Sequence, residues 1–136
     1  MAGLSPRLAA FCQVLKETAA RAGEAARLKW VDVDFEKRLI YINEPEKGSE
    51  TGVYRVSEKC IKMLENLPRK GERIFSTLQS LRVNFTNQRA RLAYKLSNPR
   101  FKQIHFHTFR HWRGTLEAYR VPNAFHVQKF LRQHPE

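Results

Sequence analysis

Residues 105 to 112 read HFHTFRHW, a stretch with three histidines and one arginine but no carboxylate. From here, apolar side chains recur at helical spacing at Phe109, Trp112, Leu116 and Tyr119. The spacing predicts a helix from about Thr108 to Tyr119 with these four side chains facing the core. His107, Arg110 and Gly114 then face the opposite side, and two side chains three positions apart on a helix can reach one ligand together.

Two other interpretations of this stretch remain open, because a pair of residues at one spacing is a weak signal. In the first, His107 caps the helix and Arg110 is solvated. In the second, His105, His107 and His111 bind zinc and the protein is a metal-dependent hydrolase. We disfavour the zinc site because no carboxylate or cysteine clusters with these histidines. We therefore predict no metal and no cofactor.

Positive charge is concentrated in the second half of the chain. Lys and Arg number 25 against 13 Asp and Glu, for a formal net charge of +12. From Arg73 to Leu116 there is no acidic residue, and aromatic side chains are interleaved with the Lys and Arg. Charge alone also fits solubility or a membrane surface, but this composition is typical of a folded surface that faces phosphates.

The chain reads as predominantly helical with a small sheet. Besides the helix from Thr108 to Tyr119, we predict five others. One begins with Ser5 as its cap and Pro6 as its first residue, and one begins after Ser57 and ends at Pro68; the other three span Ala22 to Leu28, Leu81 to Leu96 and Asn123 to Leu131. The segments VDVDF, RLIYI and TGVYRV predict two or three strands with a hairpin between Ile42 and Val53. The segment SNPRFKQ, residues 97 to 103, is predicted to be a loop. The fold class is mixed α+β, a helical domain with a small antiparallel sheet.

Composition also bounds the class of protein. A chain of 136 residues corresponds to one domain. Cys12 and Cys60 lack the paired spacing of a zinc site or a disulfide framework, which favours a reducing, intracellular compartment. No apolar run approaches the roughly 20 residues of a membrane span, and the N-terminus lacks a signal-peptide core. We expect a soluble, cytoplasmic protein that does not bind membranes.

Three segments together resemble the tyrosine recombinases, the phage-integrase family. HTFRHWRGT, residues 107 to 115, resembles the family's H-x-x-R-H box. TAARAGEAARLKWVDVDF, residues 18 to 35, is similar to its first arginine box, with Ala19 in place of the usual glycine. PEKGSETGVYRV, residues 45 to 56, resembles its β-hairpin lysine segment. The three boxes stand in the family's order and extend from Thr18 to Arg113.

The resemblance implies a domain that binds double-stranded DNA and breaks and rejoins its strands without a metal or nucleotide. Arg21 and Arg110 match the arginines that hold the scissile phosphate, and forked guanidiniums suit the charge that accumulates there. His107 matches the histidine that exchanges protons near this phosphate, and Lys47 matches the acid that protonates the leaving 5′ oxygen. The basic positions expected to contact DNA are Arg82, Arg89, Arg91, Lys95 and Arg113.

The last residues depart from the family's pattern. The family has an L-G-H segment and a nucleophilic tyrosine about ten residues later, whereas this sequence ends in VQKFLRQHPE. His134 is the candidate for the second histidine, with Gln133 at the glycine position, and no tyrosine follows Tyr119. We therefore interpret residues 1–136 as a catalytic domain shortened at its C-terminus, which is either a truncated piece of a longer protein or a degenerate gene product. We expect it to form no covalent adduct with DNA.

The alternative is a non-catalytic DNA-binding or regulatory module that keeps the fold and its phosphate-binding arginines. In either case we expect a monomer in isolation and possible self-association on DNA.

Overall fold

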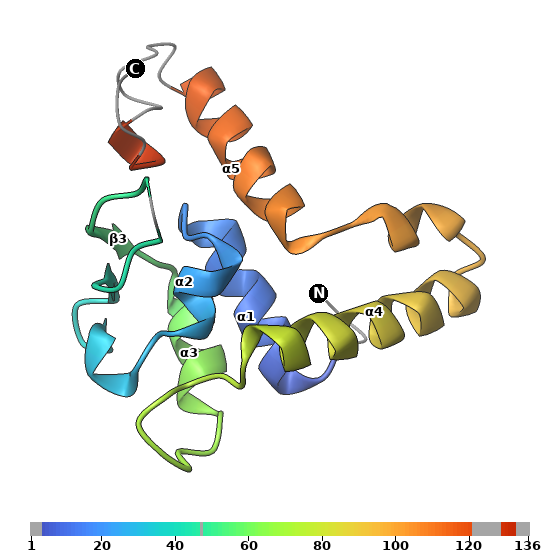
Figure 1. Cartoon of the computed structure of the whole chain (residues 1–136), viewed down its shortest axis with the longest axis horizontal. Helices are drawn as coiled ribbons and strands as arrows, with labels where there is room; N and C mark the ends of the chain where they lie inside the picture. Colours follow the sequence, from blue (N-terminus) through green and yellow to red (C-terminus); the bar gives the residue numbers. More distant parts are fainter. Residues whose placement is uncertain (1–3, 47, 121–128, 133–136) are drawn as a thin grey trace.

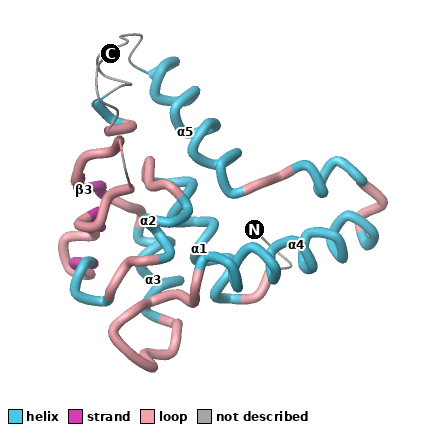
Figure 2. Tube along the Cα trace, in the orientation of Figure 1, coloured by secondary structure: helices cyan, strands magenta, loops and turns pink. Residues whose placement is uncertain are grey.

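In the computed structural model, residues 4–46, 48–120 and 129–132 are described, and their elements form a helical domain with one small sheet (Figures 1 and 2). The α-helices are α1 (Pro6–Glu17), α2 (Ala22–Ala26), α3 (Glu58–Glu65), α4 (Leu78–Lys95) and α5 (Phe106–Arg120). The strands are β1 (Val33–Asp34), β2 (Leu39–Ile42) and β3 (Gly52–Arg55), and the 3-10 helices are η1 (Trp30–Asp32) and η2 (Pro99–Gln103). The predicted fold class is confirmed.

Helix α1 lies at the centre of the core, and α2, α3, α4 and α5 all contact it. It begins where the sequence predicts: Pro6 is the first helical residue, and the Ser5 hydroxyl accepts the backbone N–H of Leu8 at 3.4 Å. The ring of Phe11 is fully buried and meets the rings of Phe75 and Phe106 edge to face. This aromatic contact joins α1 to the start of α5.

The three strands form an antiparallel sheet in the order β1-β2-β3. Ile40 pairs with Tyr54, and alternate side chains of β2 face the core, so that Ile40 and Ile42 are buried while Tyr41 is exposed. The predicted hairpin between Ile42 and Val53 is confirmed. Its loop, residues 43 to 51, reaches α2, where Arg27 Nη2 donates to the backbone oxygen of Glu44 at 3.0 Å.

Helix α2 is two residues shorter than predicted and ends at Ala26 instead of Leu28. The chain leaves the helix there because its backbone pairs with residues 72 to 74. The N–H of Ile74 donates to the oxygen of Leu28 at 3.1 Å, and the N–H of Trp30 donates to the oxygen of Glu72 at 3.0 Å. A helix continued through Leu28 would lose these bonds.

Helix α4 begins at Leu78, three residues before the predicted start, because the Thr77 hydroxyl caps it by accepting the N–H of Ser80 at 3.3 Å. The loop predicted for residues 97 to 103 is wrong in part, since Pro99–Gln103 form η2, which packs back on α4. Together, α4 and η2 extend away from the remaining helices (Figures 1 and 2).

The predicted core face of α5 is also wrong in part. Phe109 is buried as expected, but Trp112 and Leu116 are 47% and 40% exposed. Phe106 and Arg110 are buried instead, and Phe106 stacks on Phe85 of α4 with ring centroids 4.7 Å apart. The buried face is therefore rotated toward Arg110. The side chain of Tyr119 and most of the predicted helix from Asn123 to Leu131 lie outside the described residues.

No helix in the described ranges combines the length and the apolar character needed to cross a bilayer.

Candidate functional site

A cavity of about 170 Å³ brings together residues that are far apart in the sequence. It is lined from α2 and the residues before it, from the hairpin loop, from α4 and from the first turns of α5. Its lining residues are Ala20, Arg21, Ala22, Gly23, Glu46, Arg82, Phe106, His107 and Arg110. The residues that line it thus include three arginines, one histidine and one glutamate.

Arg21 immediately precedes α2. Its backbone N–H donates to Glu24 Oε1 at 2.7 Å, so Glu24 anchors the backbone of Arg21 at the start of the helix. The Arg21 Nε atom is buried and has no hydrogen-bond partner in the described part of the chain. Since a buried donor without an acceptor is costly, the Nε–H group of Arg21 is consistent with a site that receives an anion.

Arg110 is only 7% exposed and is held by backbone oxygens from two distant segments. Its Nε donates to Ala19 at 3.1 Å, and its Nη2 donates to Leu131 at 2.9 Å. Burial lowers the pKa of Arg110, and the nearby cations Arg21 and Arg132 lower it further. An arginine still keeps its charge at neutral pH, so the cavity contains a fixed, partly desolvated cation.

His107 and Arg82 line the same cavity from α5 and α4, and both side chains are exposed overall. His107 does not cap α5. That role belongs to His105 and Thr108, since the His105 N–H donates to the Thr108 hydroxyl at 3.1 Å and the Thr108 N–H donates to the His105 oxygen at 3.0 Å. With Arg110 buried, the interpretation of a helix cap beside a solvated arginine is wrong.

The other basic residues expected to contact DNA do not line this cavity. Arg91 and Lys95 are exposed on α4 beside a separate hollow of about 460 Å³. Arg89 is half-buried, and its Nη1 donates to the backbone oxygen of Ile104 and lies 3.3 Å from His105 Nδ1. Arg113 is half-buried on α5, with its guanidinium carbon 5.3 Å from the centre of the Phe130 ring.

Two predicted catalytic residues, Lys47 and His134, lie outside the described residues. Of the five, the structure therefore brings Arg21, His107 and Arg110 together. As for the zinc interpretation, no group of three or more His, Cys, Asp or Glu side chains in the described part of the chain is arranged to hold a metal ion.

The residue that sequence reasoning missed is Arg132, which is 4% exposed. Its Nη1 and Nη2 donate to Glu24 Oε2 at 3.0 Å and Oε1 at 2.5 Å, so the two side chains form a bidentate pair. Its remaining donors reach the Tyr54 hydroxyl at 2.9 Å and the backbone oxygens of Glu50 and Ala19 at 2.6 Å and 3.2 Å. All five N–H groups are thus used.

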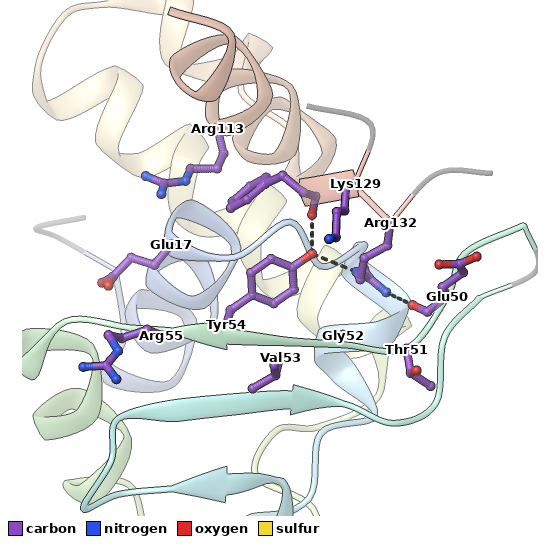
Figure 3. A pocket seen from close by; sticks show the side chains of 11 residues that line it. Glu17, Glu50, Thr51, Gly52, Val53, Tyr54, Arg55, Arg113, Lys129 and Arg132 are labelled. Carbon is purple, nitrogen blue, oxygen red and sulfur yellow. Dashed lines mark hydrogen bonds between the residues drawn. The ribbon is translucent and has the colours of Figure 1, made fainter. Parts of the chain in front are cut away.

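Figure 3 shows the hydrogen bonds that connect residues 129 to 132 to the sheet through Arg132. The Tyr54 hydroxyl accepts a bond from Arg132 and donates to the backbone oxygen of Phe130 at 2.5 Å. These residues border a groove of about 720 Å³ between β3 and α5. Because Leu131 supplies an acceptor to Arg110, the segment that Arg132 anchors also helps to orient an arginine of the small cavity.

Glu24 and Arg132 stabilise the charged form of each other. Burial by itself raises the pKa of Glu24, but hydrogen bonds from Arg132 and from the N–H groups of Arg21 and Glu46 outweigh it and hold that pKa below its usual value of 4.5. Burial lowers the pKa of Arg132, but its hydrogen bonds and electrostatic interactions with Glu24 and Tyr54 together outweigh burial, so the net shift is upward. Both groups are charged at neutral pH.

Comparison with known proteins gives one family. The model of the phage integrase family matches residues 2–131. No curated protein matches the chain.

Three solved structures are similar in fold. The crystal structure of XerA recombinase matches with a TM-score of 0.75 and 21% identity, and the match covers 96% of this chain and 50% of that chain. The integrase from mycobacterium phage Brujita matches with a TM-score of 0.65 and 18% identity, covering 94% of this chain and 43% of that chain. The Tn1549 transposon integrase in complex with transposon right end DNA matches with a TM-score of 0.64 and 20% identity, covering 93% of this chain and 50% of that chain. The chain spans about half the length of these proteins. Since the family match runs through nearly the whole sequence and includes all three boxes, this protein belongs to the phage integrase family.

Proposed function

We propose that this chain is the DNA-binding catalytic domain of a site-specific tyrosine recombinase or integrase, and that the small cavity receives the scissile phosphate of double-stranded DNA. The observation that carries the proposal is the convergence of Arg21, Arg82, Arg110 and His107 on one cavity. Besides burial, the charge of Arg21 lowers the pKa of Arg110, and an anion bound between such guanidiniums would compensate their repulsion.

In this proposal Arg21 and Arg110 bind the non-bridging oxygens of the phosphate, where negative charge accumulates as a nucleophile attacks. His107 exchanges a proton beside the same phosphate, with His134 as the second histidine. Lys47 protonates the 5′ oxygen as its bond to phosphorus breaks, because an alkoxide is a poor leaving group. The roles of these residues rest on the family resemblance together with the cavity.

The exposed basic residues would bind the DNA backbone on either side of the cavity. Arg82 lines the cavity itself, and Arg91 and Lys95 lie farther along the same helix, α4, without an acidic residue among them. Arg89 and Arg113 are half-buried and are expected to contribute less. The Tn1549 integrase, similar in fold, was solved in complex with DNA, which supports duplex DNA as the partner.

The binding half of the proposal is tested with a fluorescent duplex and fluorescence anisotropy. Arg110→Ala and Arg21→Ala are each expected to weaken binding about tenfold or more, since each removes a charge-assisted contact to phosphate. Lys59→Ala is the matched control: it also removes one positive charge, from an exposed position on α3, and is expected to change affinity less than about twofold. Equal losses in all three variants would contradict a specific phosphate site.

The catalytic half requires a tyrosine, which this sequence lacks after Tyr119. A tyrosine-bearing C-terminal segment of a family member is therefore supplied together with a nicked duplex. The tyrosine oxygen is expected to bond to phosphorus while the 5′ oxygen leaves with a proton, giving a protein-linked strand on a denaturing gel. Arg110→Ala should abolish this product and Lys59→Ala should not. DNA binding without any linked product would favour the non-catalytic module instead.

A further inference from the structure

The wall of the small cavity includes one carboxylate, that of Glu46 in the hairpin loop, among three guanidiniums. A carboxylate beside an anion site opposes the binding of the anion, so its position there has a cost. Glu46 forms no ion pair and no side-chain hydrogen bond with any described residue. In the described ranges its carboxylate therefore has no ion-pair partner, although Arg27 Nη1 lies on the same side of Gly23, 3.3 Å from the position of an added Cβ.

The backbone holds Glu46 at this place. The Glu46 N–H donates to Glu24 Oε2 at 3.0 Å, and Glu24 is itself fixed by its pairing with Arg132. The carboxylate then lies directly against Gly23 of α2, where an added Cβ would be only 1.9 Å from Glu46 Oε1. Only glycine leaves room for a side chain so close to the helix backbone. The close approach and the backbone bond together place the carboxylate at the cavity.

From this geometry we propose that Glu46 is a specificity-determining residue, which makes the cavity select singly charged phosphodiesters over doubly charged anions. This inference rests on the proposed function, in which the cavity holds a phosphate of DNA. The repulsion from a fixed carboxylate is proportional to the charge of the ligand. An internal phosphodiester carries one negative charge, whereas sulfate carries two and a terminal phosphate carries up to two. Glu46 thus penalises free dianions about twice as strongly, in free energy, as it penalises the DNA backbone.

The selectivity has a clear use. The three guanidiniums alone would bind small dianions more tightly than a diester, and cellular phosphate would compete with DNA for the cavity. One carboxylate lowers the affinity for both ligands but lowers it more for the competitor. DNA tolerates the loss of affinity at the cavity more easily than free phosphate does, because other contacts along the duplex also hold it.

The experiment compares sulfate with dimethyl phosphate, at constant ionic strength maintained with chloride. Binding to ¹⁵N-labelled protein is followed by NMR through the side-chain Nε–Hε signals of Arg21 and Arg110. The proteins are the unsubstituted chain, Glu46→Gln, Glu46→Ala, and the control Glu44→Gln, which makes the same charge change at an exposed position of the same loop. Thermal unfolding of each protein verifies that it is folded.

Removal of the Glu46 charge is expected to tighten binding by about threefold per unit of ligand charge, a typical size for a partly solvated pair. Dimethyl phosphate should then bind about threefold more tightly and sulfate about ninefold, so the selectivity ratio changes about threefold. Both Glu46 variants should behave alike, and Glu44→Gln should leave the ratio unchanged.

An equal change for the two ligands, or an equal effect of Glu44→Gln, would overturn the role of Glu46 while leaving the anion site in place. If neither ligand shifts the arginine signals in any of the four proteins, the anion site itself is refuted, and the proposed function with it.

Discussion

At the scale of single residues, the candidate site depends on a buried ion pair that is not in the cavity itself. Glu24 fixes the backbone of Arg21, and Arg132 anchors the segment whose Leu131 oxygen holds Arg110. The backbone of Arg132 is left-handed, with φ of 59°, a conformation that costs a non-glycine residue about 1 kcal/mol or more. The bonds of its side chain offset this cost.

The first prediction concerns the stability of this pair. Glu24→Gln should lower the free energy of unfolding by about 3 to 5 kcal/mol, because it leaves the Arg132 charge buried without its partner. The double variant Glu24→Gln, Arg132→Met should lose less, since it removes both charges. Urea unfolding of the single and double variants measures the difference. A single variant as stable as the unsubstituted protein would show that the pair contributes no stability.

The second prediction is the pH dependence of the same pair. The pKa of Glu24 is held below 4.5 in the folded protein, so its stabilisation is fully present above that pH and is lost as the pH falls through the folded pKa. The unfolding free energy should therefore decrease with acid below about pH 4.5, and less steeply in Glu24→Gln. Urea titrations between pH 3 and pH 7 provide the test. Identical acid slopes for both proteins would be evidence against a lowered pKa.

Arg21, His107 and Arg110 could be predicted from the sequence because they stand in short boxes with fixed spacing. Arg132 could not. Its importance comes from acceptors on Ala19, Glu24, Glu50 and Tyr54, which no local pattern links to it. Glu46 also gives no signal in a charged loop, since its effect arises only from contact with Gly23.

At the scale of elements, the helices and the hairpin follow from capping residues and periodicity, while the face of α5 does not. Periodicity ranks side chains by their apolar character, so it placed Trp112 and Leu116 in the core and Arg110 outside. Arg110 is buried because backbone oxygens accept bonds from its Nε and Nη2, and the aromatic contact of Phe106 with Phe11 and Phe85 sets the rotation of the helix.

The third prediction follows from this rotation. Phe106→Ala should cost about 3 to 5 kcal/mol of unfolding free energy, because it empties a site between two buried rings. Trp112→Ala should cost less than about 1 kcal/mol, since the indole is about half exposed. Equilibrium unfolding of the two variants shows which face of α5 is buried. A larger loss of unfolding free energy in Trp112→Ala than in Phe106→Ala would mean that the face predicted from periodicity is the buried one.

At the scale of the whole molecule, the distribution of positive charge determines which surface is expected to bind duplex DNA. The net charge is +12, and Arg73 to Leu116 contains no acidic residue. This segment includes all of α4 and η2, which extend from the other helices (Figure 1). The side chains of Arg82, Arg91 and Lys95 on α4 are exposed to solvent. The charge distribution could be predicted from composition. The extension of α4 and η2 from the other helices could not, because it depends on η2 packing back on α4.

The fourth prediction is a steep salt dependence of duplex binding. Each phosphate that the protein neutralises releases counterions, so six to ten contacts would weaken binding by about 10³ to 10⁵-fold between 50 and 200 mM salt. Arg91→Ala should reduce the slope of log affinity against log salt by about one unit if it contacts a phosphate. Anisotropy titrations at several salt concentrations give both slopes. An affinity that hardly changes with salt would exclude backbone binding by this surface.

The central claim is that the cavity of Arg21, Arg82, Arg110 and His107 receives a phosphate of DNA. A crystal structure of the chain with a short duplex tests it most directly. We predict a backbone phosphate in the cavity, with its non-bridging oxygens about 3 Å from guanidinium nitrogens of Arg21 and Arg110. A bound duplex whose phosphates all lie outside the cavity would contradict the claim.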